Sequence, residues 1–318
     1  MTEFTPGPLG YGAANVGNLY RAMSDADAQE LLDAAWNAGL RYFDTAPHYG
    51  LGLSERRLGK FLADKPRSEF IVSTKVGRLL RPNPHGAGQS DLDHDFAVPT
   101  DQKRVWDFSS DGIRSSLAES LRRTGLDRFD VVYLHDPERH DLQLGIERAI
   151  PALVGLREDG VVDRIGVGSM TTAALLACVR TGSLDLAMVA GRYTLADQSA
   201  LPELVPACRE YGVGIVNAAV FNSGLLATDS PGSDARYDYA AVPAGLLRRV
   251  QRIAEFCREA GVSLAAAALQ YSLRDPVVRS VVVGGSSPQQ ISQNVARLHE
   301  VIPVELWQRL TEQELIVA

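Results

Sequence analysis

Short runs of apolar residues alternate with longer amphipathic segments along most of the chain. Seven runs read clearly as strands, and an eighth, richer in glycine, lies near the start. The runs are Leu9–Ala14, Arg41–Asp44, Phe70–Lys75, Phe129–His135, Ile165–Gly168, Asp185–Ala190, Val213–Asn217 and Val277–Val283. Strands that alternate with helices in this way predict a parallel sheet covered by helices.

The segments between these runs carry apolar residues at the i, i+3 and i+4 spacing of amphipathic helices. The expected helices are Asp25–Ala38, Ser54–Ala63, Asp111–Gly125, Leu142–Gly160, Thr171–Gly182, Leu201–Tyr211 and Ala244–Ala260. Ser24 and Thr171 stand where a helix N-cap is expected. Eight strands favour a single α/β domain over residues 1–318, closed as a (β/α)8 TIM barrel. An open doubly wound sheet is the alternative that periodicity alone permits.

Two long polar segments, Gly77–Asp107 and Ser223–Val242, interrupt this alternation. Connections longer than about 15 residues are uncommon unless they are functional or disordered. Each segment follows the C-terminal end of a predicted strand, which is the face where barrel active sites form. We therefore expect both to act as lids over a site, with tolerated surface insertions as the alternative.

Composition narrows the class of protein. The chain has 318 residues, 45% of them hydrophobic, a net charge of −7 and a pI of about 5.4. This balance gives no basic footprint for nucleic acid or an anionic membrane surface. Its three cysteines have no metal-type spacing, and no apolar run approaches the roughly 20 residues that span a bilayer. We expect a soluble cytoplasmic protein that acts on a small molecule, and the sequence favours no particular oligomeric state.

Polar residues close several of the predicted strands. Asp44 ends one strand and is followed by Tyr49 in the next loop, Lys75 ends the following strand, and His135 ends the one after. Parallel strands bring their C-terminal ends to one rim, so these side chains should converge. A buried lysine is costly unless it is paired, and Asp44 on the neighbouring strand can supply the partner of Lys75.

This set of residues predicts acid–base chemistry. A tyrosine phenol normally has a pKa of about 10, and an adjacent ammonium lowers that pKa by favouring the phenolate. Tyr49 beside Lys75 could therefore exchange a proton with a hydroxyl or carbonyl oxygen, while His135 orients that oxygen and Asp44 holds Lys75. Taken alone, each residue is better explained by a structural role: a cap for Asp44, packing for Tyr49, a rim salt bridge for Lys75 and a core histidine for His135. Together on one rim they favour catalysis.

A candidate phosphate site lies near the end of the chain. The segment Val281–Asn294 reads as a strand, a Gly-Gly-Ser-Ser turn and a helix whose first residue is Pro288. Free amides at a helix N-terminus bind phosphate without a basic side chain. Such turns are also common helix caps, but this one follows the eighth strand, where barrels often bind phosphate.

Several segments of the chain resemble the aldo-keto reductase superfamily. The stretch FDTAPHYGLGLSERRLGKFL (Phe43–Leu62) is similar to its most specific signature, and Ser73–Lys75 and Tyr133–Asp136 fall at the family's spacings. Three further segments are most similar to the branch of L-fucose and D-threo-aldose 1-dehydrogenases and pyridoxal 4-dehydrogenase. These segments are Lys75–Pro82, Trp106–Asp130 and Val220–Ala227. The resemblance implies a barrel, a catalytic tetrad of the four rim residues, and an NAD(P) cofactor extended across the barrel mouth.

The resemblance also implies binding residues. Those for the cofactor are Ser169, Asn217, Ser223, Gly224, Leu226, Gly284, Ser286, Gln290 and Asn294. Those for the substrate are His48, Trp106, Phe221 and Asn222, with His94 in the same long segment as Trp106. No metal site is expected, because the six histidines form no ligand cluster in the sequence.

Several positions depart from the family pattern. Met170 stands where many relatives have the asparagine of a Ser-Asn pair, Arg192 replaces a glutamine, and Ala218 replaces an aromatic residue that stacks on nicotinamide. Gly284 and Gln290 stand where NADP-preferring relatives have a lysine and an arginine. Each lost charge-assisted hydrogen bond to the extra phosphate is worth roughly 1.5–3 kcal/mol. We therefore expect NAD, with NADP the less favoured cofactor.

The leading hypothesis is an NAD-dependent oxidoreductase that converts a cyclic hemiacetal to a lactone. The substrate would be an aldose such as L-fucose, oxidised at C1, or pyridoxal, with Tyr49 as the general acid or base. One alternative is a broad carbonyl reductase that uses NADPH, which Gly284 and Gln290 disfavour. Another is a non-catalytic, cofactor-sensing subunit, which the intact tetrad disfavours.

Overall fold

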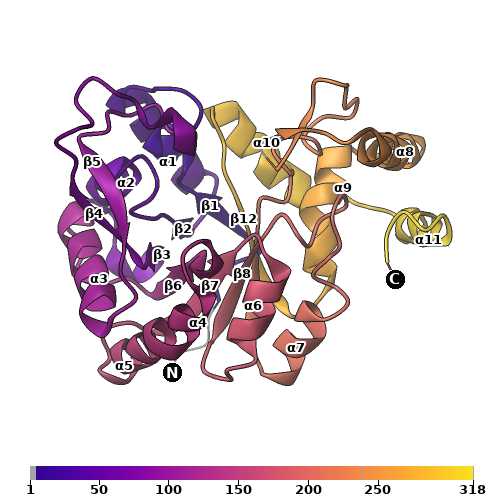
Figure 1. The fold of residues 1–318 in the computed structure, drawn as a ribbon. Helices are drawn as coiled ribbons and strands as arrows, with labels where there is room; N and C mark the ends of the chain where they lie inside the picture. Colours follow the sequence, from indigo (N-terminus) through magenta and orange to yellow (C-terminus); the bar gives the residue numbers. More distant parts are fainter. Residues whose placement is uncertain (1–4, 239, 318) are drawn as a thin grey trace.

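A closed barrel of parallel strands forms the centre of the computed structural model, which describes residues 5–238 and 240–317. Its eight strands follow the order β1-β12-β9-β8-β7-β6-β3-β2 (Figure 1). They are β1 (Leu9–Gly12), β2 (Tyr42–Asp44), β3 (Ile71–Val76), β6 (Val131–His135), β7 (Arg164–Ser169), β8 (Leu186–Ala190), β9 (Gly214–Ala218) and β12 (Val278–Val283). The predicted (β/α)8 barrel is confirmed.

Helices surround the barrel (Figure 1). They are α1 (Asp25–Asn37), α2 (Leu53–Leu62), α3 (Ser110–Thr124), α4 (Leu142–Leu144), α5 (Ile150–Glu158), α6 (Thr172–Val179), α7 (Leu204–Glu210), α8 (Ala244–Glu259), α9 (Leu264–Tyr271), α10 (Pro288–Leu298) and α11 (Val304–Glu312). Ser24 caps α1 as expected, because its hydroxyl accepts the Asp27 amide. Within the described residues, no helix combines the length and apolar character needed to cross a bilayer.

The continuous helix predicted over Leu142–Gly160 is interrupted. A π-helical segment, Gly145–Ala149, separates α4 from α5. Pro151 lies in the first turn of α5 and has no amide hydrogen to donate to the preceding turn. A single π-helical turn at this point lets the chain continue as one rod despite the missing hydrogen bond.

Alternate residues of each barrel strand face different layers, as the pleat requires. One set fills the barrel interior with a cluster that includes Tyr42, Tyr133, Met188 and Val216. The other set, such as Phe43 on β2, joins the larger core between the barrel and the helices. This parity decides which strand residues reach the mouth of the barrel.

The two long polar segments contain short strands of their own. The segment after β3 forms an antiparallel hairpin of β4 (Arg78–Pro82) and β5 (Gln102–Trp106). The segment after β9 pairs only two residues on each side, in β10 (Arg236–Tyr237) and β11 (Ala240–Ala241). In the closed order β3 and β9 are four strands apart in either direction, so the two segments leave opposite sides of the barrel.

Candidate active site at the barrel mouth

A cavity of about 400 Å³ opens at the C-terminal ends of the barrel strands. All four residues of the predicted tetrad line it: Asp44, Tyr49, Lys75 and His135. Asp44 and Lys75 end up inside because they share the inward parity of β2 and β3, next to each other in the barrel. The sequence therefore placed these four residues on one rim correctly.

Lys75 is enclosed and paired. Its Nζ lies 2.6 Å from Asp44 Oδ2 and donates to the Thr45 carbonyl at 3.0 Å. Burial alone would lower the pKa of Lys75, but the Asp44 carboxylate and the contact with Tyr49 outweigh it and raise the pKa. Lys75 is thus a permanent ammonium at neutral pH, and the predicted carboxylate partner is confirmed.

A chain of hydrogen bonds continues below this pair into the barrel. Ser73 Oγ donates to Asp44 Oδ1 at 2.7 Å, and Tyr42 Oη lies 3.1 Å from Ser73 Oγ. Tyr42 Oη is also 3.2 Å from Tyr133 Oη. Both oxygens of Asp44 therefore have partners, which fixes the carboxylate that orients Lys75.

Tyr49 lies directly against the charged amine. The Lys75 Nζ is 4.7 Å from the centroid of the Tyr49 ring, and a hydrogen bond between the two side chains contributes to the raised pKa of Lys75. The His135 ring stands edge-on to Tyr49, with centroids 6.1 Å apart. Burial, together with the charges of Arg78 and Lys75, holds the pKa of His135 well below its usual range. His135 is therefore a neutral imidazole that can donate or accept one hydrogen bond.

Aromatic and imidazole side chains line the side of the cavity next to the β4–β5 hairpin. His48 lies between His135 and His94, with ring centroids 5.6 Å and 5.8 Å away. Phe96 stands edge-on to His48 at 5.5 Å and lies 6.0 Å from the Tyr49 ring. His48, His94 and Phe96 all line the cavity.

Among the four predicted substrate residues, only His48 lines the cavity. Trp106 stacks on His140 with centroids 5.4 Å apart. Phe221 packs against the core outside the barrel. The Asn222 amide is buried and donates to the Gly191 carbonyl. Trp106, Phe221 and Asn222 thus support the rim rather than form the cavity wall.

The wall at the ends of β7, β8, β9, β12 and β1 contains several small residues beside Met170, Met188 and Val282. Gly12, Ala190, Ala218 and Gly284 line it, together with Ser169. The Ser169 hydroxyl already donates to Glu138 Oε1 and accepts the Thr171 amide. Of the nine predicted cofactor residues, Ser169 and Gly284 are the ones on the cavity wall.

The remaining predicted cofactor residues lie elsewhere. Asn217 has the outward parity of β9, and its buried amide donates to the Tyr193 carbonyl and Ser272 Oγ. The Leu226 side chain is in the core, and its amide donates to the Phe221 carbonyl. Ser223 and Gly224 are exposed at the start of the segment after β9. The structure does not bring these residues into the cavity.

The turn before α10 forms a compact cap. Ser287 Oγ accepts the Gln290 amide, and Gln290 Oε1 accepts both the amide and the hydroxyl of Ser286. Asn294 Nδ2 lies 3.4 Å from the Gly284 carbonyl. Arg21, from the loop after β1, donates to the Ser286 carbonyl at 2.9 Å. The structure therefore adds one cation to this turn that the sequence did not suggest.

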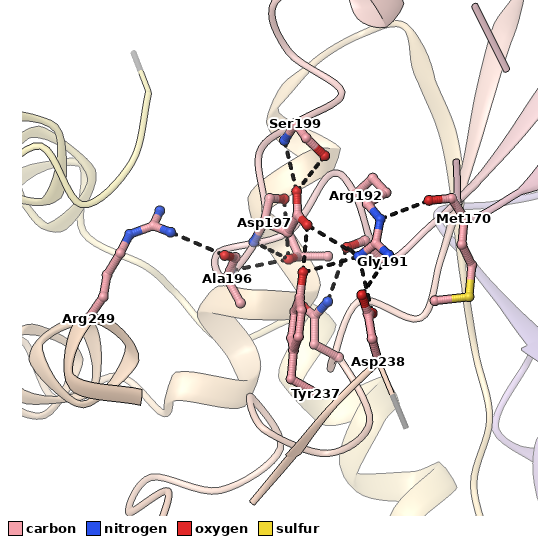
Figure 2. A network of polar contacts seen from close by, with 11 residues as sticks. Met170, Gly191, Arg192, Ala196, Asp197, Ser199, Tyr237, Asp238 and Arg249 are labelled. Atoms are coloured by element: carbon pink, nitrogen blue, oxygen red, sulfur yellow. Dashed lines mark hydrogen bonds and ion pairs between the residues drawn. The ribbon is translucent and has the colours of Figure 1, made fainter. Parts of the chain in front are cut away.

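Arg192 is the centre of a polar network beside the ends of β7 and β8 (Figure 2). Its guanidinium donates to Asp238 Oδ2 at 2.6 Å, to Asp197 Oδ2 at 3.2 Å and to the Met170 carbonyl at 2.8 Å. Tyr237 Oη donates to Asp197 Oδ2 at 2.6 Å. Arg192 thus joins the ends of β7 and β8 to the segment after β9.

Several cavity residues were missed by the sequence reasoning. Asn15 and Leu19 reach the wall from the loop after β1, and Phe96 and Arg139 reach it from the hairpin and the turn after β6. They lie in connections, where neither strand parity nor helical periodicity indicates a direction. Asn15 had one usable signal, because it follows the first strand just as other site residues follow theirs.

Comparisons with known proteins agree with this geometry. The sequence profile of the Aldo/keto reductase family matches residues 8–314. The chain is 59% identical over 309 residues to D-threo-aldose 1-dehydrogenase from Pseudomonas sp, covering 97% of this chain and 94% of that protein. It is 38% identical over 330 residues to pyridoxal 4-dehydrogenase from Microbacterium luteolum, covering 99% and 96%.

A solved structure is also similar. The holo form of an aldo-keto reductase from Bacillus halodurans superposes with a TM-score of 0.72 at 26% sequence identity, covering 96% of this chain and 91% of that one. L-galactose dehydrogenase from Arabidopsis thaliana is 31% identical over 315 residues, covering 97% and 90%. The cavity residues, the barrel and the extent of these matches lead to one conclusion. The chain belongs to the aldo/keto reductase family of oxidoreductases.

Proposed function

We propose that this protein oxidises the cyclic hemiacetal of an aldose at C1 to a lactone, with NAD as the cofactor. The observation that carries the proposal is the contact of Tyr49 with the buried Lys75–Asp44 pair at the mouth of the barrel. Such an oxidation removes one hydride from carbon and one proton from oxygen. The arrangement supplies a site for the proton.

The wall of small residues fits a nicotinamide dinucleotide. A Cβ placed on Gly284 would lie 2.4 Å from Asn15 Oδ1, and one on Gly12 would lie 3.2 Å from a Val282 methyl group. Ala218 leaves space where a larger side chain would fill the wall. Ser169 would hold the carboxamide end. The start of α10 would hold a phosphate through amides other than those of Ser286 and Gln290, which the cap already uses. When bound, this cofactor supplies the hydride acceptor.

Within the proposal, Tyr49 takes the proton of the C1 hydroxyl. A neighbouring ammonium favours a phenolate, so Lys75 prepares Tyr49 for this role. Asp44 keeps the ammonium in place through a 2.6 Å contact. The neutral His135 imidazole donates a hydrogen bond to the substrate oxygen and so aligns it with Tyr49. This division of roles uses each member of the tetrad once.

The polar lining of the cavity supports an aldose as the substrate. Asp93, Asp95, His94 and Arg139 surround its outer part, which suits a molecule with several hydroxyl groups. The relative from Pseudomonas that is 59% identical carries the name of an aldose dehydrogenase. Pyridoxal is the second candidate, because Phe96 lies beside Tyr49 and offers a face for an aromatic ring.

The NAD preference rests on Gly284 and Gln290, because neither offers a cation to a 2′-phosphate. Gln290 Oε1 is an acceptor that is already used by Ser286. Arg21 is the cation that the turn does contact. We expect the value of kcat/KM to be higher with NAD than with NADP. A higher kcat/KM with NADP would contradict this expectation. If that NADP preference were then lost in Arg21→Gln, it would be assigned to Arg21.

The proposal is tested by following NADH formation with a panel of aldoses of both enantiomeric series and with pyridoxal. We expect an aldose to be the best substrate and its lactone to be found by mass spectrometry. Tyr49→Phe should lower kcat by roughly 10²–10⁴-fold, the range for losing a general base, whereas Tyr211→Phe, at an exposed surface position, should not. Full turnover in Tyr49→Phe would overturn the mechanism, and no turnover with any aldose would overturn the substrate class.

A further inference from the structure

A row of three imidazoles runs from the candidate catalytic centre to the outer part of the cavity. His135 lies beside Tyr49, His48 lies next to His135, and His94 lies next to His48. We propose that His48 and His94 form a hydroxyl-binding subsite that recognises the sugar beyond C1. This inference rests on the proposed aldose oxidation and names the residues that select the substrate.

His48 has hydrogen-bonding capacity that the protein leaves unused. Its Nδ1 is buried without a partner among the described residues. Its ring lines the cavity, and its backbone carbonyl accepts a hydrogen bond from Arg104. Because Nδ1 is enclosed by protein, we assign the contact with the ligand to the other ring nitrogen, Nε2. Burial, together with the charges of Arg78 and Arg104, holds the pKa of His48 well below its usual range, so the ring is neutral.

A buried ion pair in the hairpin holds both rings in place. The Arg104 guanidinium donates to both oxygens of Asp91, and the two side chains are 9% and 5% exposed. The same guanidinium donates to the His48 carbonyl at 2.8 Å. Asp91 Oδ1 also lies 3.0 Å from His94 Nδ1. One ion pair therefore fixes the backbone of His48 and the ring of His94.

The hydrogen bond between Asp91 and His94 also sets the tautomer of the His94 ring. An ionised carboxylate can only accept, so His94 Nδ1 donates its hydrogen to Asp91. In the neutral ring Nε2 then has a free lone pair. A carboxylate that orients a functional imidazole through its other nitrogen is a common supporting arrangement in protein sites. Here it leaves an acceptor at the rim of the cavity.

The chemistry of the surroundings favours neutral hydroxyl groups as ligands. Arg78 and Arg104 are already paired with Asp136 and Asp91, so they are not free to bind a phosphate or a carboxylate. Arg139, which also lines the cavity, lies 3.6 Å from Asp136, and the cavity residues Asp93 and Asp95 would repel an anion. A metal is not favoured either, because the described residues contain no group of three His, Cys, Asp or Glu side chains placed to share an ion.

The test compares an aldose that the protein oxidises with its analogues that each lack one hydroxyl beyond C1. Replacing His48 by leucine removes the ring nitrogen, while glutamine keeps a polar atom near the position of Nε2. We expect His48→Leu to lower kcat/KM for the full aldose by about tenfold, the effect of one hydrogen bond. One deoxy analogue should be affected little, because it lacks the group that His48 binds. His48→Gln should recover most of the loss.

A binding measurement separates recognition from chemistry. An anhydroalditol lacks the C1 hydroxyl but keeps the others, so it can bind without being oxidised. Calorimetry should show its Kd rise by about the same factor in His48→Leu, and by less in His94→Leu because the His94 side chain is 51% exposed. Asp91→Asn should weaken binding as well. Asp130→Asn is its matched control, since Asp130 is buried and paired with Arg67 but precedes β6, away from the mouth.

Three results are decisive. Selective loss on the full aldose, with recovery in His48→Gln, supports the subsite. Equal losses on the full and all deoxy sugars, with an unchanged Kd for the anhydroalditol, overturn it while leaving the proposed oxidation intact. A wild-type protein that oxidises no aldose overturns the proposed function itself. Thermal melts of each variant establish that the compared proteins are folded.

Discussion

The hairpin after β3 and the segment after β9 rise from opposite sides of the barrel, but different contacts hold them (Figure 1). Five backbone pairs join β4 to β5, whereas β10 and β11 share two. The Arg104–Asp91 pair under the hairpin is almost fully buried. The Arg192–Asp238 pair that ties down the other segment has side chains 17% and 31% exposed. The hairpin is therefore built as a fixed wall.

The segment after β9 begins with an unusual turn. Ala219, Asn222 and Ser223 have φ values of 53°, 44° and 58°, in the left-handed region that favours glycine. Such residues cost of the order of 1–3 kcal/mol each and persist when their surroundings hold them. The Asn222 amide, which donates to the Gly191 carbonyl, is one such contact. Opening this segment would break a two-pair ladder and partly exposed ion pairs, whereas opening the hairpin would break a five-pair ladder and expose a buried ion pair.

The hairpin and the segment after β9 should therefore behave differently during catalysis. A fixed hairpin keeps His48 and His94 preorganised for the substrate, since their contacts with Arg104 and Asp91 do not depend on a ligand. The segment after β9 is held by partly exposed ion pairs, so we expect it to open more readily than the hairpin, over the wall proposed for the cofactor. We therefore expect substrate selection to be set by the hairpin and cofactor exchange by the segment after β9.

The largest effect is expected from breaking the buried pair in the hairpin. Arg104→Met leaves the buried Asp91 carboxylate without its cation and with only the hydrogen bond to His94, and losses of this kind cost about 3–5 kcal/mol. Urea unfolding should show this decrease in the free energy of unfolding. Asp238→Asn, which removes a partly exposed carboxylate, should cost about 1 kcal/mol or less. Similar losses for the two variants would remove the distinction between the two sides.

A pH effect of intermediate size should come from the buried histidines on the hairpin side. Burial lowers the pKa of both His48 and His135 well below 6.5 in the folded protein. Below about pH 6.5 the unfolded chain binds these protons and the folded protein does not. The free energy of unfolding should therefore fall with falling pH, by up to about 1.4 kcal/mol per pH unit for each histidine.

Substitution of one histidine shows how much it contributes to the pH dependence of the free energy of unfolding. His135→Asn should flatten the pH dependence of unfolding by the equivalent of one proton, measured by urea titrations between neutral and mildly acidic pH. Arg192→Gln should leave the slope unchanged, because Arg192 contacts carboxylates and a tyrosine rather than a histidine. An unchanged slope in His135→Asn would mean that His135 binds its proton as readily in the folded protein as in the unfolded chain.

Side chains could be placed from the sequence where the barrel strands fix the direction in which they point. A buried lysine requires a carboxylate, and neighbouring parallel strands bring their ends together, so the contact between Lys75 and Asp44 could be inferred. Asn217 shows the limit of that reasoning. It ends a predicted strand, but the residue on either side of it faces the interior, and a shift of one residue along a strand reverses the face.

Side chains in the connections could not be placed from sequence. Trp106 and His94 belong to the same long segment, and both were expected near the substrate. The register of the hairpin pairs Arg78 with Trp106 and stacks that ring on His140, whereas His94 reaches the cavity. Nothing local to either residue encodes that register, because it arises from the pairing of two stretches about 20 residues apart.

The smallest effect is expected from releasing the segment after β9. Arg192→Gln removes the ion pairs with Asp238 and Asp197 and the contact with Tyr237 (Figure 2). Partly exposed pairs of this kind contribute up to about 1 kcal/mol, so the open form should become about fivefold more populated. Hydrogen exchange across residues 223–238 should quicken by that factor. Exchange in β4 and β5 should not change.

Salt provides an independent version of the same experiment. Screening weakens exposed pairs far more than buried ones, so raising the ionic strength of the wild type should quicken exchange in residues 223–238 and leave the hairpin unaffected. Arg192→Gln should show little further response, because its main pair is already absent. Arg309→Gln breaks an exposed pair with Glu259 far from the mouth and serves as the control. Equal salt responses in both segments would mean that partial exposure of the Arg192 pairs does not control opening.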